Sequence, residues 1–179
     1  MGSQKEVKKE IKKGRSAKND FFKNHPKSPL IEEEKNNFTG LNYFPIDLDY
    51  RFELDFHEYD NKEKLEVEDS KGNKQDFIRW GKFELEIHDQ QVTLQAYKGD
   101  LEEEGLWVPF RDKTNGKETY GAGRYLDLAP QNEEDDKWVL DFNEAYNPFC
   151  AYNEDYICPL IPPENWIEVE IKAGEKKYH

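Results

Sequence analysis

Apolar and polar residues alternate with a period of two along most of the chain after residue 48. Between residues 48 and 56, five apolar residues are separated by charged ones, which is the pattern of a β-strand with one buried and one solvated face. The alternation returns in seven later segments, so the sequence predicts about eight strands. These segments are 65–67, 83–87, 92–96, 106–110, 126–128, 138–142 and 167–171.

Short turn-forming stretches separate these strands. They are 69–73, which contains Gly72, then 89–90, 98–100 and 115–116. Gly, Asn and Asp tolerate the backbone angles of tight turns, whereas parallel strands need crossovers of a dozen or more residues. The fold class is therefore mainly β: an antiparallel meander of about eight strands that forms a barrel or a two-sheet sandwich, because one-sided strands must bury their apolar faces against each other.

The N-terminal segment has a different period. Val7, Ile11, Gly14, Lys18 and Phe21/Phe22 recur at spacings of three and four, which predicts an amphipathic helix, and the His-Pro and Ser-Pro pairs at 25–26 and 28–29 end it. The sequence thus predicts a basic helical arm at 1–30 and a single antiparallel β domain at 31–179. We expect the arm to dock on an acidic body; a nucleic-acid or anionic-membrane contact is less well supported, because three acids interrupt the lysines.

The amino-acid composition limits the kinds of partner that the protein can bind. The chain of 179 residues is 14% aromatic, which favours a folded protein over a disordered one. Its net charge is −13, with +6 in residues 1–28 (nine Lys/Arg, three Asp/Glu) and −19 in the remainder (17 against 36). That balance argues against nucleic-acid binding. No apolar run is long enough for a membrane span, and no signal-peptide core is present. We expect a cytoplasmic protein, or one from the cell envelope or outside the cell if a signal was removed.

The alternation also predicts which polar residues face inward. If Val108 and Phe110 face the interior, then Asp112 does too. If Leu126 and Leu128 face the interior, then Arg124 and Tyr120 do too, because they have the same parity along the strand. This register requires a loop with an odd number of residues, and a three-residue turn around Asn115-Gly116 would provide one. A buried arginine must be paired with a carboxylate, and Glu175 and Asp141 are the expected partners of Arg124. Arg124 would then either lock one end of the barrel or bind an anionic ligand in its mouth.

A lid rich in proline and cysteine follows at 143–165. Its four prolines exclude a regular strand and its asparagines favour turns. The tyrosines of the lid would either complete the core or line a pocket. Cys150 and Cys158 suit a structural disulfide; free buried thiols are the next interpretation, and a metal or catalytic role is the weakest because no histidine lies in the lid.

Three segments resemble a known family. FTGLNYFPID (38–47), PFRDKTNGKETYGAGRYLDL (109–128) and DFNEAYNPFCAYNEDYICPLIPPEN (141–165), with IKAGEK at 171–176, are similar to the domain-of-unknown-function 1684 family of uncharacterised bacterial and archaeal proteins. The similarity extends from about residue 27 to the C-terminus. Ile161 stands where the family often has proline, and Trp166 where smaller or basic residues are frequent. The resemblance marks positions and implies no reaction, ligand or partner.

Three functions remain open. The first is a binding module whose polar pocket holds a small polar or anionic molecule. The second is a hydrolase- or isomerase-type enzyme in which Asp141 or Glu175 acts as base and Arg124 or Arg111 stabilises negative charge. The third is a structural or interaction domain without a ligand. We predict no metal and no cofactor, because no motif for either occurs. The candidate pocket comprises Arg111, Asp112, Tyr120, Arg124, Asp141, Asn143, Tyr146, Asn147, Asn165 and Glu175.

Overall fold

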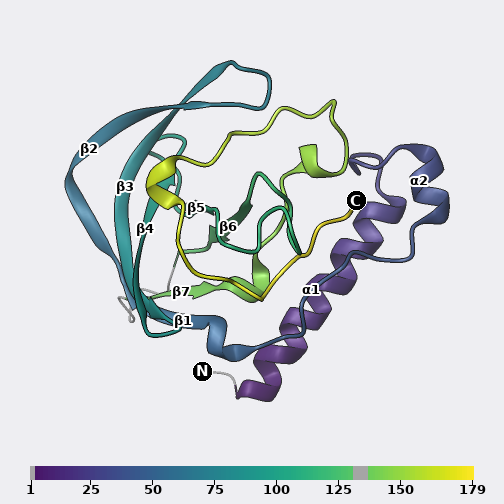
Figure 1. Cartoon of the computed structure of the whole chain (residues 1–179), viewed down its shortest axis with the longest axis horizontal. Helices are drawn as coiled ribbons and strands as arrows, with labels where there is room; N and C mark the ends of the chain where they lie inside the picture. The colour runs from purple at the N-terminus through teal and green to yellow at the C-terminus, as the bar shows by residue number, and fades with distance from the viewer. Residues whose placement is uncertain (1–2, 131–136) are drawn as a thin grey trace.

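The structure, a computed structural model, describes residues 3–130 and 137–179 as two antiparallel sheets with a long N-terminal helix against them (Figure 1). The larger sheet has five strands in the order of the chain, so the predicted meander is confirmed for this sheet. These strands are β2 (His57–Glu68), β3 (Lys74–Ile87), β4 (Gln90–Lys98), β5 (Leu106–Phe110) and β6 (Arg124–Leu128).

A tight turn at His88 and Asp89 joins β3 to β4, one residue earlier than the sequence pattern suggested. Both residues have positive φ, 50° and 61°, as a two-residue turn of type I′ requires. The connection from β5 to β6 is instead long. It occupies residues 111–123 and not the three-residue turn expected around Asn115-Gly116. Its length is nevertheless odd, and the register pairs Phe110 with Arg124.

The smaller sheet pairs β1 (Arg51–Asp55) with β7 (Lys137–Asp141). No closed barrel forms among the described residues, because β1 and β7 pair only with each other and leave β2 and β6 as the edges of the larger sheet. The barrel alternative is therefore wrong, and the arrangement is sandwich-like. The apolar faces of both sheets meet in one core, with members such as Phe83, Leu94, Val108, Leu126 and Leu140.

Two predicted strand segments take other forms. Residues 48–50 are a 3-10 turn, η1 (Leu48–Tyr50), that precedes β1. Residues 167–171 belong to no strand, so the structure has seven strands among its described residues and not eight. The predicted parity of this segment is nonetheless right, because Val169, Ile171 and Ala173 are all buried. The segment is held by scattered backbone bonds, such as that from Ile167 N–H to the Arg111 carbonyl at 2.8 Å.

The N-terminal helix forms as the sequence predicts. Helix α1 (Gln4–Asn24) begins with a capping box between Ser3 and Glu6 and ends before His25, and a short helix, α2 (Glu32–Asn37), follows. Phe22 of α1 is 1% exposed and packs edge-on against Tyr152 of the lid, with ring centroids 4.8 Å apart. Tyr152 and its lid neighbour Phe149 thus belong to a second core beneath α1, as the core interpretation of the lid aromatics predicted.

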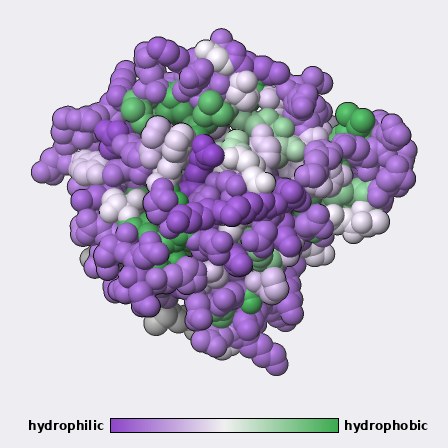
Figure 2. All heavy atoms as spheres, in the orientation of Figure 1, coloured by the Kyte–Doolittle hydropathy of each residue, from purple (hydrophilic) through white to green (hydrophobic). Residues whose placement is uncertain are grey.

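The lid contains three 3-10 turns and no strand. They are η2 (Phe142–Glu144), which begins one residue before it, η3 (Phe149–Ala151) and η4 (Pro163–Asn165). The visible face of the molecule is mostly hydrophilic, with small separate groups of hydrophobic residues (Figure 2). None of the helices in the described part of the chain combines the length and the apolar character that a membrane crossing needs.

Candidate functional site

Arg124 lies inside the core and binds the C-terminal segment. Its side chain is fully buried, as the alternation predicts. The guanidinium donates to the carbonyl oxygens of Ala173, of Glu175 at 3.2 Å and of Ile171 at 2.9 Å. These carbonyls would otherwise need a neighbouring strand. Arg124 therefore takes the place of a strand partner for this segment, in which Val169, Ile171 and Ala173 are buried without joining a sheet.

The carboxylate partner of Arg124 is Asp112, 3.5 Å away, with both side chains 0% exposed. It is neither Glu175 nor Asp141, the two carboxylates that the sequence suggested. Burial lowers the pKa of Arg124, and the Asp112 charge opposes that shift. Asp112 also accepts the Ile171 amide at 2.7 Å and the Thr114 hydroxyl at 2.8 Å. The pair thus fixes the C-terminal segment to the loop after β5.

Other predicted pocket residues also use their polar atoms in hydrogen bonds and ion pairs within the fold. Asn143 exchanges hydrogen bonds with the backbone of Asp47, and Asp141 accepts a bond from Arg51 at 2.9 Å. Asn165 likewise joins the backbones of residues 95 and 109 across β4 and β5. These groups hold loops to the sheets and leave little capacity for a ligand.

The remaining predicted residues lie apart from one another. Arg111 stacks on the exposed Trp166 ring, 4.5 Å from its centroid. The Tyr146 hydroxyl donates to Asp127 at 2.6 Å, and that of Tyr120 lies 3.7 Å from Cys150 Sγ. The ten residues therefore do not surround one cavity.

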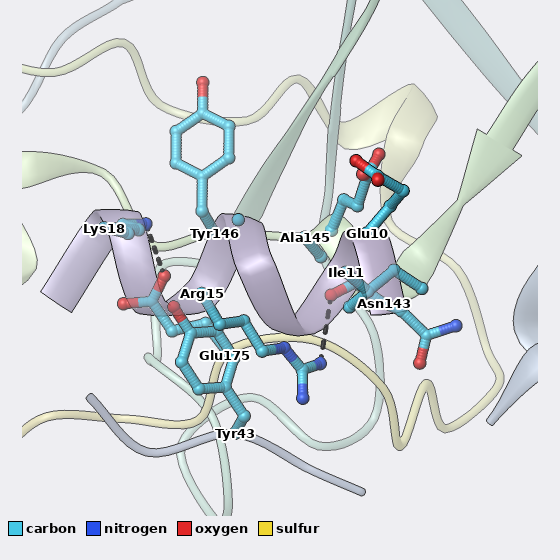
Figure 3. A pocket seen from close by; sticks show the side chains of 11 residues that line it. Glu10, Ile11, Arg15, Lys18, Tyr43, Asn143, Ala145, Tyr146 and Glu175 are labelled. Atoms are coloured by element: carbon cyan, nitrogen blue, oxygen red, sulfur yellow. Dashed lines mark hydrogen bonds and ion pairs between the residues drawn. The ribbon is translucent and has the colours of Figure 1, made fainter. Parts of the chain in front are cut away.

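A cavity of about 160 Å³ lies instead between α1 and the loops that carry Asn143 and Glu175 (Figure 3). Only three of the predicted residues, Asn143, Tyr146 and Glu175, belong to its wall. Figure 3 shows Asn143 directing its side-chain amide away from Arg15, to which it offers its backbone carbonyl. The full lining is Glu10, Ile11, Gly14, Arg15, Lys18, Tyr43, Asn143, Glu144, Ala145, Tyr146 and Glu175.

A buried ion pair forms one side of this cavity. Lys18 Nζ lies 2.8 Å from Glu175 Oε2, and the glutamate side chain is only 1% exposed. Asn147 donates to the same carboxylate from its backbone at 3.3 Å and its amide at 3.4 Å. Burial raises the pKa of Glu175, and the charge and hydrogen bond of Lys18 oppose the shift. The carboxylate is thus held in place in a poorly solvated position.

Arg15 forms the other side. Its guanidinium donates to the carbonyls of Phe44 and Asn143, both at 3.2 Å, and stacks on the Tyr43 ring at 4.2 Å. Burial lowers the pKa of Arg15, and Nε is buried without a hydrogen-bond partner among the described residues. No described carboxylate forms an ion pair with Arg15, so its charge faces the cavity without direct neutralisation.

Sequence reasoning missed Arg15 and assigned Lys18 to a docking face. Both come from the helix that the pattern treated as a solvated arm. One signal was present, because the predicted stripe included Gly14 and Lys18 among its apolar residues. A glycine and a lysine in the docking stripe of a helix indicate that the helix leaves a polar gap against the rest of the protein at that point.

Cys150 and Cys158 are free thiols, so the predicted structural disulfide is wrong. The lid is fastened by hydrogen bonds instead: Cys158 N–H donates to Ser70 Oγ at 3.1 Å, and Ser70 N–H to the Cys158 carbonyl at 2.9 Å. The two thiols are neighbours, and the Cys150 amide donates to Cys158 Sγ at 3.3 Å. No cluster of three or more metal-ligating side chains occurs in the described part of the chain.

A family model and solved structures both match the chain. Residues 36–176 match a family described as "Protein of unknown function (DUF1684)". The solution NMR structure of an uncharacterised protein from Haloarcula marismortui superposes with a TM-score of 0.75 and 35% sequence identity, over 96% of this chain and 95% of that one. Among curated proteins, none matches the chain.

Proposed function

We propose that this chain, which belongs to the DUF1684 family of proteins of unknown function, binds a compact polar molecule with an anionic group in the cavity beneath α1. The observation that carries the proposal is Arg15. A cationic side chain borders the cavity, stacks on Tyr43 and retains a buried N–H group without a hydrogen-bond partner among the described residues. Buried donors of this kind are normally satisfied, and a bound anion would satisfy this one.

The size and charge of the cavity restrict the ligand. A volume of about 160 Å³ is below the 300–1,000 Å³ typical of sites for drug-sized molecules. Lys18 is already paired with Glu175, whereas the hydrogen bonds of Arg15 within the described part of the chain go to neutral carbonyl groups. The anionic end of the ligand would therefore face Arg15. Glu10, Glu144 and Glu175 on the same wall favour a polar or cationic group at the other end.

A ligand panel tests this proposal. Inorganic phosphate, short carboxylates and small amino acids are screened by thermal shift against the wild type and Arg15→Met. At a concentration 100 times Kd, a binder stabilises the native state by about 2.7 kcal/mol, which is a shift of several degrees. Lys13→Met is the matched control, because Lys13 is exposed on the same helix. Stabilisers that act equally on wild type and Arg15→Met would refute the Arg15 site.

Gly14 provides a second test. It lines the cavity, and a Cβ atom built on it meets no atom within 4 Å. Gly14→Met therefore adds bulk at the cavity without a backbone clash. A ligand held beneath α1 should lose affinity for this variant, although Arg15 and Lys18 remain unchanged. Unaltered affinity for Gly14→Met would place the binding elsewhere.

Acid–base catalysis at the same cavity is the second candidate. It is favoured by Glu175, a buried carboxyl group whose pKa is raised by burial, since general acids and bases act best when their pKa lies close to the working pH. The sequence also suggested Asp141 as the base and Arg124 as the stabilising cation. Asp141 is instead paired with Arg51, and Arg124 is bound to backbone carbonyls. If a compound from the panel is converted, Glu175→Gln should abolish its turnover. Retained turnover would exclude Glu175 as the acid or base.

A further inference from the structure

Two cysteines of the lid and a tyrosine of a neighbouring loop form a group of reactive side chains that the cavity beneath α1 does not include. Cys150 lies in η3 and is half-buried, whereas Cys158 is buried with 8% exposure. Tyr120, from the loop between β5 and β6, places its hydroxyl 3.7 Å from Cys150 Sγ. Two side chains that carry a mobile proton thus adjoin the one thiol that is accessible to solvent.

The backbone fixes this arrangement. The η3 turn is closed by the bond from Ala151 N–H to the Pro148 carbonyl at 2.9 Å. Cys158 is attached to the β2–β3 hairpin through Ser70, and the Cys150 amide donates to Cys158 Sγ at 3.3 Å. The positions of the two sulfur atoms are therefore set before any reaction occurs.

The surroundings favour the ionised form of Cys150. The hydrogen bond from Cys158 is the largest cause that lowers the pKa of Cys150 to about 6, and the Tyr120 hydroxyl and the nearby Lys71 act in the same direction. The pKa values of Cys158 and Tyr120 are raised, so both retain their protons and serve as donors.

The position of each sulfur decides its role. A thiolate is the nucleophilic form of cysteine, and reactive cysteines are partly exposed and stabilised by neighbouring donors or cations. Cys150 meets these conditions, whereas Cys158 is covered and remains protonated. Metal binding is less well supported, because two sulfurs without further His, Cys, Asp or Glu partners in the described part of the chain fall short of the four ligands of a structural zinc site.

We propose that Cys150 is a modification site that takes up a small thiol by exchange with a low-molecular-weight disulfide. The Cys150 thiolate attacks one sulfur of the disulfide RSSR, a new S–S bond joins Cys150 to SR, and RS⁻ leaves with the electron pair of the broken bond. Tyr120 contacts the attacking sulfur through its hydroxyl, Cys158 lies beside it and accepts the Cys150 amide, and neither takes part in the bond exchange.

The test is the reaction of the full chain with dithiodipyridine, whose thiopyridone product is measured by absorbance. We expect release of one equivalent, with mass spectrometry locating a single pyridylthio group on Cys150. The pH–rate profile should have an apparent pKa near 6. Cys150→Ser should abolish the rapid release of thiopyridone.

Variants of the two donors distinguish a tuned thiolate from an ordinary accessible thiol. Tyr120→Phe and Cys158→Ala should each move the apparent pKa upward and slow the reaction at pH 6 by about three- to tenfold, since each removes one hydrogen bond to a charged group. Tyr156→Phe is the matched control, because Tyr156 lies in the same lid and packs against the Phe149 ring. Near-ultraviolet circular dichroism checks the fold, and Tyr120→Phe carries the test if Cys158→Ala does not fold.

Three outcomes would overturn the proposal. One is an adduct on Cys158 in place of Cys150. Another is an apparent pKa at or above that of free cysteine, about 8.5. The third is release of two equivalents without a retained adduct, because Cys158 would then have displaced the small thiol. This site and the cavity at Arg15 share no residue, so each proposal stands or fails without the other.

Discussion

Arg124 shows how one side chain can replace a neighbouring strand. Its guanidinium binds three carbonyl groups of the C-terminal segment while its carboxylate partner, Asp112, accepts the Ile171 amide. The Arg124 charge also lies over the Phe110 ring, 5.1 Å from the ring centroid. A group in this position contributes to the fold through bonds that a neutral side chain of the same size is unable to make.

We expect Arg124→Met to lower the free energy of unfolding by about 3–5 kcal/mol, because it leaves the buried Asp112 charge without its countercharge and three carbonyls without their donor. Arg124→Lys should recover only part of this loss, since one ammonium group lacks the geometry of the guanidinium fork. Urea denaturation measures both. The control is Lys74→Met, which breaks the exposed pair with Glu66 and should cost less than about 1 kcal/mol. Equal losses for Arg124→Met and Lys74→Met would contradict this account.

Glu175 gives a prediction for the dependence of stability on pH. Its pKa is raised in the folded protein from the ordinary value of 4.5, so the folded state binds the proton more tightly than the unfolded state. The contribution of this group is therefore fully present below pH 4.5 and is lost as the pH rises through the raised pKa. Glu175→Gln should remove that decline, and thermal melts between pH 4 and 7 would compare the slopes. Identical slopes for both proteins would show that Glu175 is not perturbed.

At the residue scale, the sequence predicted burial better than it predicted partners. The parity of Arg124, Asp112 and Glu175 followed from local alternation, which needs no knowledge of distant contacts. The partners did not follow, because Lys18 and Glu175 are 157 positions apart and no local pattern joins them. The same limit explains why Arg15 was missed: its stacking on Tyr43 and its bond to the Asn143 carbonyl depend on where α1 docks.

At the scale of elements, alternation and turn chemistry located most strands but left their closure undetermined. A one-sided strand buries its apolar face equally well in a barrel or in a sandwich. The choice depends on strand pairing, and here β7 returns to pair with β1. A strand was predicted at 167–171 because the segment has the correct period, but hydrogen bonds from its backbone join it to the loop after β5 and to the Arg124 side chain.

Two glycines in different elements should respond oppositely to the same substitution. Gly14 is inside α1 and a Cβ there meets nothing within 4 Å, so Gly14→Ala should stabilise the protein by up to about 1 kcal/mol through helix propensity. Gly123 has φ +101°, and a Cβ would lie 2.7 Å from the Phe110 carbonyl oxygen. Gly123→Ala should therefore destabilise by more than about 1 kcal/mol. Chemical denaturation of both variants checks the signs, and a stabilising Gly123→Ala would contradict the observed backbone geometry.

At the scale of the whole molecule, α1 is part of the core and not an appended arm. Phe22 contributes to the second core together with Leu30, Phe38 and Tyr152. Lys18 and Arg15 of the same helix bond to the C-terminal segment and to the loop after β7. Of the basic residues in α1, Lys18 forms an ion pair with the body through Glu175, whereas Lys5, Lys8, Lys9, Lys12, Lys13 and Lys23 are exposed.

Phe22→Ala should accordingly lower the free energy of unfolding by about 3–5 kcal/mol, the usual cost of emptying a fully buried phenylalanine site. Lys13→Ala, at an exposed position of the same helix, should change stability by less than about 0.5 kcal/mol. Guanidinium denaturation would compare the two. A small loss for Phe22→Ala would mean that α1 is only loosely attached and that the cavity beneath it lacks a fixed wall.

The ion pair between Lys18 and Glu175 also bears on the order of events during synthesis. The helix leaves the ribosome well before its partner, which is added 157 positions later. Throughout that interval Phe22 can pack only against nearby members of its core such as Leu30 and Phe38, because Tyr152 also follows late in the chain. Contacts of such long sequence separation slow folding, so α1 of the nascent protein stays partly uncovered, and open to aggregation or to chaperones, until residue 175 emerges.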